Sequence, residues 1–216
     1  MEEIRVIGVD EAGRGSLIGP LVVSGCSVPI GLLHKLRELG VKDSKKLSPN
    51  KRKELFEQIK GLKEIKLLSF KIKTHLIDAY VWSKEKGVNL NYLEAVYMAK
   101  IIDKLPGILA VVDAADANES NFLKMVAENM RSKKSVVSAH HADENYVVVS
   151  AASIVAKVTR DLEVEKIRKR IGDFGSGYPS DRRTIDFIRS VSNPEVYRFI
   201  RLSWKTLYKN KSIHSL

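Results

Sequence analysis

The sequence predicts an α/β protein with a mixed sheet, because two β-rich runs open the chain and helical and strand patterns alternate after them. The chain has 216 residues, of which 44% are hydrophobic, so one domain can bury a sizeable core. Residues 4–9 and 20–28 are the opening runs, separated by a glycine-containing turn, and we expect them to pair as consecutive strands. A third strand is expected at residues 65–72.

The helices and the later strands follow from capping residues and apolar spacing. Ser48-Pro49 is a favourable helix start and predicts a helix over residues 51–59. Apolar residues recur at helical spacing from Leu93 to Leu105, and Pro106-Gly107 ends that helix before an apolar strand at residues 108–112. A helix at 119–130, a strand at 135–139 and a long helix from about 149 to 171 complete the alternation.

The composition changes after Gly172, where the chain continues as a Gly/Ser-rich loop followed by two short, basic helical segments at residues 184–190 and 195–208. The sequence therefore predicts a core over residues 1–172 and a helical extension over residues 173–216. We expect the two parts to form one integrated domain.

The charge of the chain favours a polyanionic partner. Lys and Arg number 37 against 26 acids, which gives a formal net charge of +11. Cys26 is the only cysteine, so an intramolecular disulfide and a cysteine-based zinc cluster are excluded. Neither an N-terminal leader nor 18 consecutive apolar residues are present, and we expect a cytoplasmic protein outside the membrane.

The segment that carries most information is Val9-Asp10-Glu11-Ala12-Gly13-Arg14-Gly15, at the end of the first predicted strand. Carboxylates such as those of Asp10 and Glu11 bind hard divalent cations. The backbone N–H groups of a glycine turn and the forked guanidinium of Arg14 suit phosphate oxygens. A metal site beside an anion site predicts phosphodiester chemistry.

Two further acids are placed to join this pair. Asp113 ends an apolar strand, and strand ends at one sheet edge share a crevice. Asp143 precedes the long helix and is a fourth candidate. Each has a structural alternative, since an aspartate can cap a turn and acids are common at helix N-termini.

Two other site types are disfavoured by spacing. Adjacent His140 and His141 point in different directions and lack the spacing of a zinc motif. Gly13, Gly15 and Gly19 follow a strand as in a dinucleotide-binding loop, but a predicted strand follows them where that loop needs a helix.

Several polar residues are candidate nucleic-acid contacts, although each also fits an ordinary solvated or packed position. Residues 42–47 place three lysines beside a serine before a helix start. Tyr178 lies in a polar loop, where its ring can stack on a sugar or base. Ser153, Lys157 and Arg160 form one stripe on the long helix.

Six segments, taken together and in order, resemble ribonuclease HII, the type 2 ribonuclease H family, with archaeal features in the last segment. They are Asp10-Glu11-Ala12-Gly13-Arg14-Gly15, Asp43-Ser44-Lys45-Lys46-Leu47, Val112-Asp113, Ala142-Asp143, Ser150-Ala151-Ala152-Ser153-Ile154-Val155-Ala156-Lys157-Val158-Thr159-Arg160-Asp161 and Gly175-Ser176-Gly177-Tyr178-Pro179-Ser180-Asp181. The resemblance implies a ribonuclease H-like fold, with a mixed five-stranded sheet flanked by helices and a C-terminal helical extension.

The resemblance also implies an activity and its partners. The family hydrolyses the RNA strand of RNA–DNA hybrids and cuts 5′ of single ribonucleotides embedded in duplex DNA, as an endonuclease of DNA replication and repair. We expect a monomer that binds these duplexes, and we identify no replication-clamp motif in residues 209–216.

By position, the family's metal-site acids fall on the same four residues that the pattern selects, namely Asp10, Glu11, Asp113 and Asp143. Recognition of the ribose 2′-OH at the RNA-to-DNA junction falls on Gly13, Arg14, Gly15 and Tyr178. The expected phosphate contacts are Lys46, Ser153 and Lys157.

The expected cofactors are two Mg²⁺ or Mn²⁺ ions, present with substrate bound. One ion would generate hydroxide for in-line attack and the other would stabilise the leaving oxygen, which leaves 3′-hydroxyl and 5′-phosphate ends. Three residues depart from the family pattern without removing an acid: Ser16 and Arg183 replace prolines and His141 replaces a lysine.

Two other function classes are compatible with parts of the sequence. A non-catalytic nucleic-acid binder explains the basic composition but does not need the acids, and it binds without cutting. A nucleotide-dependent transferase would use the glycine turn and bind nucleotide saturably, but the missing helix after Gly19 opposes it.

Overall fold

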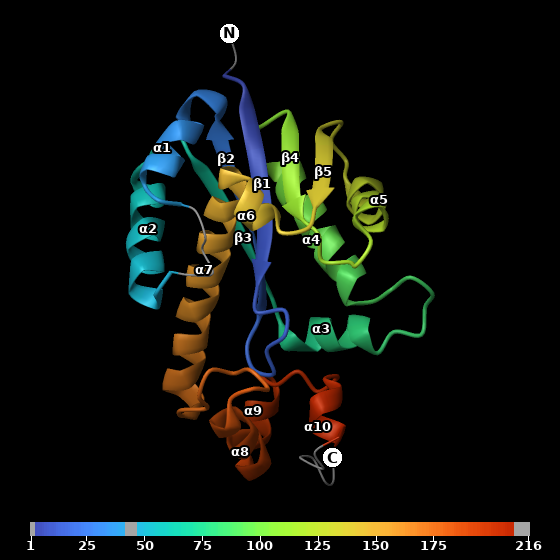
Figure 1. The fold of residues 1–216 in the computed structure, drawn as a ribbon. Helices are drawn as coiled ribbons and strands as arrows, with labels where there is room; N and C mark the ends of the chain where they lie inside the picture. Colours follow the sequence, from blue (N-terminus) through green and yellow to red (C-terminus); the bar gives the residue numbers. More distant parts are fainter. Residues whose placement is uncertain (1–2, 42–46, 210–216) are drawn as a thin grey trace.

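The computed structural model of the protein describes residues 3–41 and 47–209, and its centre is a five-stranded sheet in the order β3-β2-β1-β4-β5 (Figure 1). β1 (Arg5–Ala12) pairs antiparallel with β2 (Leu21–Pro29) and parallel with β4 (Leu109–Asp113). β3 (Lys66–Ile72) is antiparallel to β2, and β5 (Ser135–Ala139) is parallel to β4. The predicted α/β class with a mixed five-stranded sheet is confirmed.

Helices cover both faces of the sheet, and each face has its own apolar core. On one face pack α1 (Leu33–Glu38), which follows the short turn η1 (Ile30–Leu32), α2 (Pro49–Gly61) and α7 (Val147–Ile171). On the other face pack α3 (Thr74–Val81), α4 (Leu90–Lys104) and α5 (Glu119–Asn129). The short helix α6 (Ala142–Asn145) leads from β5 into α7.

Helix α7 lies unusually close to β1, and a glycine makes this possible. A Cβ atom at Gly8 would lie 2.2 Å from the carbonyl oxygen of Val148, so only glycine fits between the strand and the helix. Successive side chains of a strand alternate between faces, so Asp10, two residues after Gly8, also faces α7. The close approach of α7 therefore brings the start of this helix to the first candidate acid.

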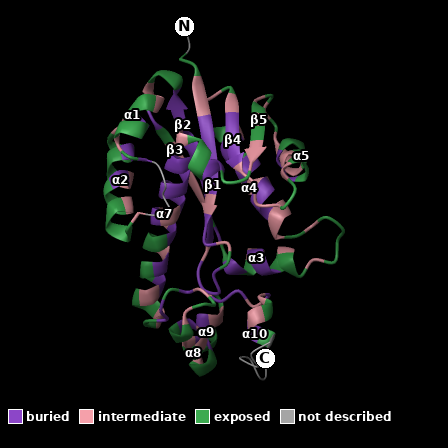
Figure 2. Ribbon diagram, viewed as in Figure 1, coloured by how far each residue is buried: buried purple, intermediate pink, exposed green. Residues whose placement is uncertain are grey.

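The C-terminal residues fold against the loop that follows β1. α8 (Arg182–Ser190) and α9 (Pro194–Tyr197) lie near the far end of α7, and α10 (Lys205–Lys209) lies below α3 in the view of Figure 1. A third apolar cluster joins Leu17 and Ile18 of the loop to Phe174 and Ile200. Much of the loop is consequently buried, as Figure 2 shows. No helix in the described part of the chain is long and apolar enough to span a membrane.

Some predicted boundaries were wrong, and each error has a tertiary cause. β1 continues through Asp10 and Glu11 to Ala12, because β2 pairs with it along its whole length, so these acids lie within the strand and not after it. The single helical segment predicted at 195–208 is interrupted between α9 and α10, where Ile200 forms a β-bridge with Ile18. Helices α1, α3 and α6 were not predicted from the sequence.

Candidate active site

Asp10 is a buried carboxylate in the middle of a polar cluster. Its side chain is only 4% exposed, and its Oδ1 accepts a hydrogen bond of 2.7 Å from the backbone N–H of Glu11. Burial, and after it the neighbouring charges of Glu11 and Asp113, raises the pKa of Asp10 well above its ordinary value. A hydrogen bond from Ser153 of α7 acts in the opposite direction and favours the ionised form. The three carboxylates therefore interact, and burial and mutual repulsion disfavour the ionised form of Asp10.

Glu11 points to the other face of β1, toward the loop that contains Arg14. Burial and the charge of Asp113 raise the pKa of Glu11, and the guanidinium of Arg14 lowers it. The Oε2 atom of Glu11 is buried and has no hydrogen-bond partner. Such an atom is costly to bury without a partner, and a divalent cation is a ligand that fits it.

Asp113 and Asp143 are joined through the start of α6. The Oδ1 atom of Asp113 accepts a hydrogen bond of 2.7 Å from the backbone N–H of Ala142, so the structural capping role and the proximity to the other acids coexist. Asp143 is the next residue and is 3% exposed. The Nζ atom of Lys157 on α7 lies 4.0 Å from its Oδ2. This contact places a cation from the predicted polar stripe beside the fourth acid.

The four predicted acids and the predicted contacts Ser153 and Lys157 form two neighbouring groups. Asp10, Glu11, Asp113 and Ser153 are in mutual electrostatic or hydrogen-bond contact, and Asp143 and Lys157 form a neighbouring pair. Within residues 3–41 and 47–209, no three His, Cys, Asp or Glu side chains already surround a common point. Lys46 lies outside the described residues.

The loop between β1 and β2 is held in one shape by its backbone. Gly13 has φ +84°, and a Cβ atom there would lie 2.8 Å from the Nε atom of Arg160. Ser16, which stands where the family pattern has proline, is fully buried. Its hydroxyl donates to the carbonyl oxygen of Gly13 at 2.9 Å, and its backbone N–H donates to the same atom at 3.3 Å. A proline could make neither bond, so both hydrogen bonds that close this turn depend on serine.

We expect Ser16→Ala to lower the free energy of unfolding by about 1 kcal/mol, because it removes one buried hydrogen bond and leaves the backbone bond in place. Urea denaturation followed by circular dichroism measures this difference. Ser190→Ala is the matched control, since the hydroxyl of Ser190 also donates to a carbonyl three residues earlier but is exposed. Equal losses in the two variants would contradict the role of Ser16.

The side chain of Arg14 is oriented by partners from α4. It forms an ion pair with Glu94, whose side chain is completely buried, and its Nη2 donates to the Oδ1 of Asn91 at 2.5 Å. Asn91 in turn donates to Asp116 at 2.7 Å, in the segment that follows β4. Arg14 is therefore tied to the strand end that carries Asp113.

Tyr178 and the Gly-rich segment around it lie against the same loop. The carbonyl oxygen of Gly177 accepts from the backbone N–H groups of Leu17 and Ile18, at 2.7 and 3.2 Å. The guanidinium of Arg160 lies 4.6 Å from the centre of the Tyr178 ring. The loop after β1 and the predicted stacking residue thus form one surface, although they are about 160 residues apart in sequence.

Arg201 holds the loop after β1 in place, and this role was not predicted from the sequence. Its side chain has no exposed area, and its Nε and Nη2 atoms each donate to the carbonyl oxygen of Gly19 at 3.1 Å. Its Nη1 donates to the carbonyl oxygen of Arg14 at 2.7 Å. Burial, and after it the charge of Arg160, lowers the pKa of Arg201 to about 9, so it remains a cation at neutral pH. The one side chain fixes both ends of the segment from Arg14 to Gly19.

The sequence offered a signal for one of the missed residues. Glu94 is an acid among the buried, apolar positions of α4, and such a residue needs a partner. Arg201 gave no comparable signal, because it is one cation in a basic tail.

The adjacent histidines His140 and His141 contact separate glutamates. His140 lies 3.9 Å from Glu119, and His141 lies 3.6 Å from Glu144.

Comparison with known proteins gives consistent matches over nearly the whole chain. Residues 7–207 match the family model described as Ribonuclease HII. The ribonuclease HII of Methanothermobacter thermautotrophicus is 40% identical over 211 residues, which cover 96% of this chain and all of that protein. A chain of the PCNA:RNase HII complex from Archaeoglobus fulgidus superposes with a TM-score of 0.84 at 36% identity and 98% coverage of both chains. Bst-RNase HIII in complex with Mn²⁺ has a TM-score of 0.75 at 20% identity, over 97% of this chain and 70% of that one, and shares the fold.

Proposed function

The chain belongs to the ribonuclease HII family and is therefore a ribonuclease H, and from this premise we propose that it also cuts 5′ of single ribonucleotides in duplex DNA. As a ribonuclease H it is a hydrolase and endonuclease that acts on RNA–DNA hybrids. The observation that supports a metal-dependent reaction is the buried cluster of Asp10, Glu11 and Asp113 with its unpartnered Glu11 oxygen.

We assign four acids as ligands of two Mg²⁺ or Mn²⁺ ions: Asp10, Glu11, Asp113 and Asp143. When bound, the two ions would supply an activated water for in-line attack and stabilise the charge on the leaving 3′ oxygen, so that the products carry 3′-hydroxyl and 5′-phosphate ends. The burial and mutual repulsion of these carboxylates favour binding of cations, because a cation relieves both costs.

Residues of α7 and α6 hold the acids in place. Ser153 donates to Asp10 and keeps it oriented, and the N–H of Ala142 does the same for Asp113. Lys157 lies beside Asp143, where its ammonium group is also positioned to contact a substrate phosphate. Ser153 is fully buried and bonded to Asp10, so we propose that it orients this acid instead of making the predicted phosphate contact. For Lys157 we keep the predicted substrate contact, and Lys46 keeps it as a prediction outside the described residues.

The segment Gly13-Arg14-Gly15 and Tyr178 would recognise the ribonucleotide. Gly15 is exposed, and no atom lies within 4 Å of the place where a side chain would begin, so a nucleic-acid strand can approach its backbone closely. Arg14 is held by Glu94, which leaves little of its orientation to be fixed on binding. The 2′-OH is the group that these contacts must read, because it alone distinguishes RNA from DNA at one position.

We propose that residues 173–216 supply substrate-binding elements as part of one integrated domain with residues 1–172. Gly177, Tyr178 and Arg201 support this, since all three contact the loop after β1 or its partner Arg160. The Archaeoglobus fulgidus relative was solved with PCNA. In this chain residues 210–216 lie outside the described range and contain no clamp motif that we identify, so we assign no clamp contact.

We expect Tyr178→Ala to reduce kcat/KM on a duplex with a single ribonucleotide by about 10- to 100-fold, and to affect a long RNA–DNA hybrid by less than threefold. Loss of a stacking contact costs about 1–3 kcal/mol, and a long hybrid offers many alternative registers. Tyr178→Phe is the control, because it keeps the ring that Arg160 contacts. An equal loss on both substrates would refute a role in junction recognition.

Metal binding tests the proposal without relying on turnover. We expect wild-type protein to bind Mn²⁺ measurably by electron paramagnetic resonance, and Asp113→Asn to bind it at least tenfold more weakly and to lose hybrid cleavage by orders of magnitude. Asp186→Asn, at an exposed acid of α8, should match the wild type in both assays. If Asp113→Asn retained normal Mn²⁺ affinity and activity, Asp113 would not belong to the site.

A further inference from the structure

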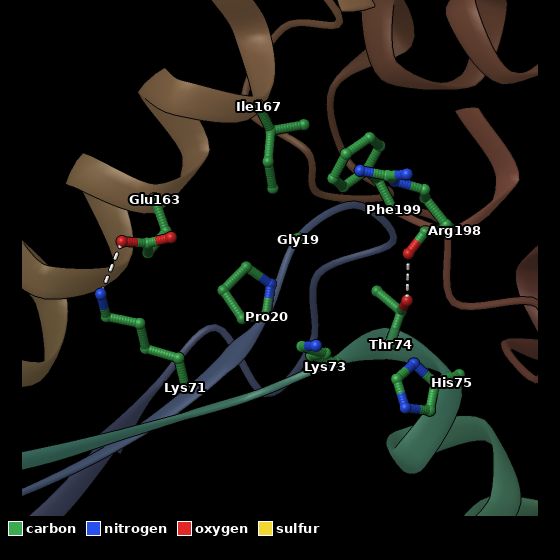
Figure 3. A pocket seen from close by; sticks show the side chains of 10 residues that line it. All are labelled: Gly19, Pro20, Lys71, Lys73, Thr74, His75, Glu163, Ile167, Arg198 and Phe199. Atoms are coloured by element: carbon green, nitrogen blue, oxygen red, sulfur yellow. Dashed lines mark hydrogen bonds and ion pairs between the residues drawn. The ribbon is translucent and has the colours of Figure 1, made fainter. Parts of the chain in front are cut away.

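A groove of about 530 Å³ lies beside the end of β3 (Figure 3), and none of the four acids lines it. Four segments that are distant in sequence form its walls: the turn before β2, the β3–α3 connection, the second half of α7 and the residues that follow α9. The residues that matter for its chemistry are Pro20, Lys71, Lys73, Glu163, Ile167, Arg198 and Phe199. None of them belongs to the predicted active site.

The charge of the groove is predominantly positive. Three permanently cationic side chains, those of Lys71, Lys73 and Arg198, line it together with a single carboxylate, that of Glu163. Glu163 is already bonded to two lysines, Lys71 at 2.7 Å and Lys166 at 2.8 Å. Arg198 forms an ion pair of 2.9 Å with the exposed Glu195. Within the described residues Lys73 makes no ion pair, so its charge is available for an anion.

The groove also offers an apolar wall beside these charges. Pro20, Ile167 and Phe199 line it, and the guanidinium of Arg198 lies 4.9 Å from the centre of the Phe199 ring (Figure 3). The first turn of α3 also lines the groove. Lys73 is the N-cap residue of this helix, and its side chain forms no capping hydrogen bond. A cationic groove with an aromatic side chain is the combination by which proteins hold the phosphates, sugars and bases of single strands.

The groove adjoins the loop between β1 and β2, which we call the recognition loop because it carries Gly13, Arg14 and Gly15. Gly19 and Pro20, which end the loop after β1, line this groove, whereas Arg14 and Gly15 of the same loop line a separate hollow of about 590 Å³. Its volume suits about one or two nucleotides and is too small for a duplex. An unpaired strand is therefore the form of nucleic acid that fits it.

We propose that this groove is a second nucleic-acid site, which binds a single-stranded segment with phosphates on Lys73 and Arg198 and sugars or a base against Phe199. The site lies outside the cleavage machinery and does not depend on the assigned activity. It would let the protein hold an unpaired strand next to the duplex that it cuts.

The test is the binding of fluorescein-labelled d(T)12, measured by fluorescence anisotropy in EDTA at several salt concentrations. We expect the double variant Lys73→Gln/Arg198→Gln to raise the Kd about tenfold at 50 mM salt, and to reduce the slope of log K against log salt by about 1.4, which corresponds to two phosphate contacts. Lys35→Gln/Arg37→Gln on α1, at the other end of the molecule, removes the same charge and should change the Kd less than twofold.

Four further readouts decide between outcomes: the unfolding temperature, hybrid cleavage, the binding of Lys73→Glu and the binding of dTMP. The Lys73→Gln/Arg198→Gln protein should unfold within about 3 °C of the wild type and cleave a fully paired hybrid with kcat/KM within twofold, which separates this site from the active site. Lys73→Glu reverses the charge at this position and should weaken d(T)12 binding more than the loss of that charge alone. An equal loss in the α1 control, no loss in the groove variants, or binding of dTMP as tight as that of d(T)12 would each overturn the proposal.

Discussion

Asp10→Asn is expected to abolish cleavage and to make the folded protein more stable. Asparagine keeps the shape of the side chain but removes a charge that is buried and repelled by Glu11 and Asp113. In EDTA we expect the unfolding midpoint to rise by about 2–5 °C, while turnover with Mg²⁺ or Mn²⁺ falls by at least about a thousandfold. Thermal denaturation and a hybrid-cleavage assay measure the two effects on one preparation.

The pH dependence of this gain follows from the direction of the pKa shift. The pKa of Asp10 is raised in the folded state, so folding favours its protonated form. Wild-type stability from this group is complete below the unfolded-state pKa of about 3.9, and is lost as the pH rises through the higher folded-state value. The advantage of Asp10→Asn should consequently grow as the pH rises from about 3.9 toward the folded-state pKa, and level off above it. An advantage that stays constant or shrinks over this range would contradict the raised pKa.

Arg201→Met is expected to cause the largest loss of stability among the residues outside the acid cluster. Methionine fills much of the volume but cannot donate to the carbonyl oxygens of Gly19 and Arg14, which would be left buried without that partner. We expect the free energy of unfolding to fall by about 3 kcal/mol and the midpoint by about 6–12 °C.

The recognition loop should lose its shape along with this anchor. We expect Arg201→Met to raise KM for the single-ribonucleotide duplex at a temperature where the protein is still folded, with a smaller change in kcat. Arg198→Met, three residues earlier and about half exposed, should alter neither KM nor the midpoint appreciably. Arg201→Lys, which keeps the cation but fewer donors, should lie between wild type and Arg201→Met. Identical behaviour of Arg201→Met and Arg198→Met would show that the buried guanidinium has no anchoring role.

The parts of the fold that could be predicted from the sequence are those set by local pattern. Asp113 was identified because an apolar strand ends there. The strand at 135–139 was placed correctly because polar residues flank it on both sides. The extension of β1 through Asp10 and Glu11 could not be predicted in this way, because pairing with β2 outweighs the low strand propensity of two acids.

The C-terminal part shows the limit of local reasoning most clearly. Residues 195–208 have a helical composition, yet the stretch around Ile200 pairs with Ile18 and positions Arg201 beneath the loop. A contact between residues about 180 apart leaves no trace in a local pattern. Glu94 is an intermediate case, since its burial follows from its place in α4, but its partner Arg14 does not.

The most direct test of the central claim is cleavage of an end-labelled DNA duplex that contains one ribonucleotide, with Mg²⁺, Mn²⁺ or EDTA, beside an all-DNA duplex and Asp113→Asn. We predict one metal-dependent cut on the 5′ side of the ribonucleotide that leaves a 3′-hydroxyl end. The cut should be absent from the all-DNA duplex and from the Asp113→Asn protein. Cleavage of a long hybrid without cleavage at the single ribonucleotide would contradict the roles given to Gly13, Arg14, Gly15 and Tyr178. Cleavage in EDTA, or by Asp113→Asn at the wild-type rate, would contradict the carboxylate metal site.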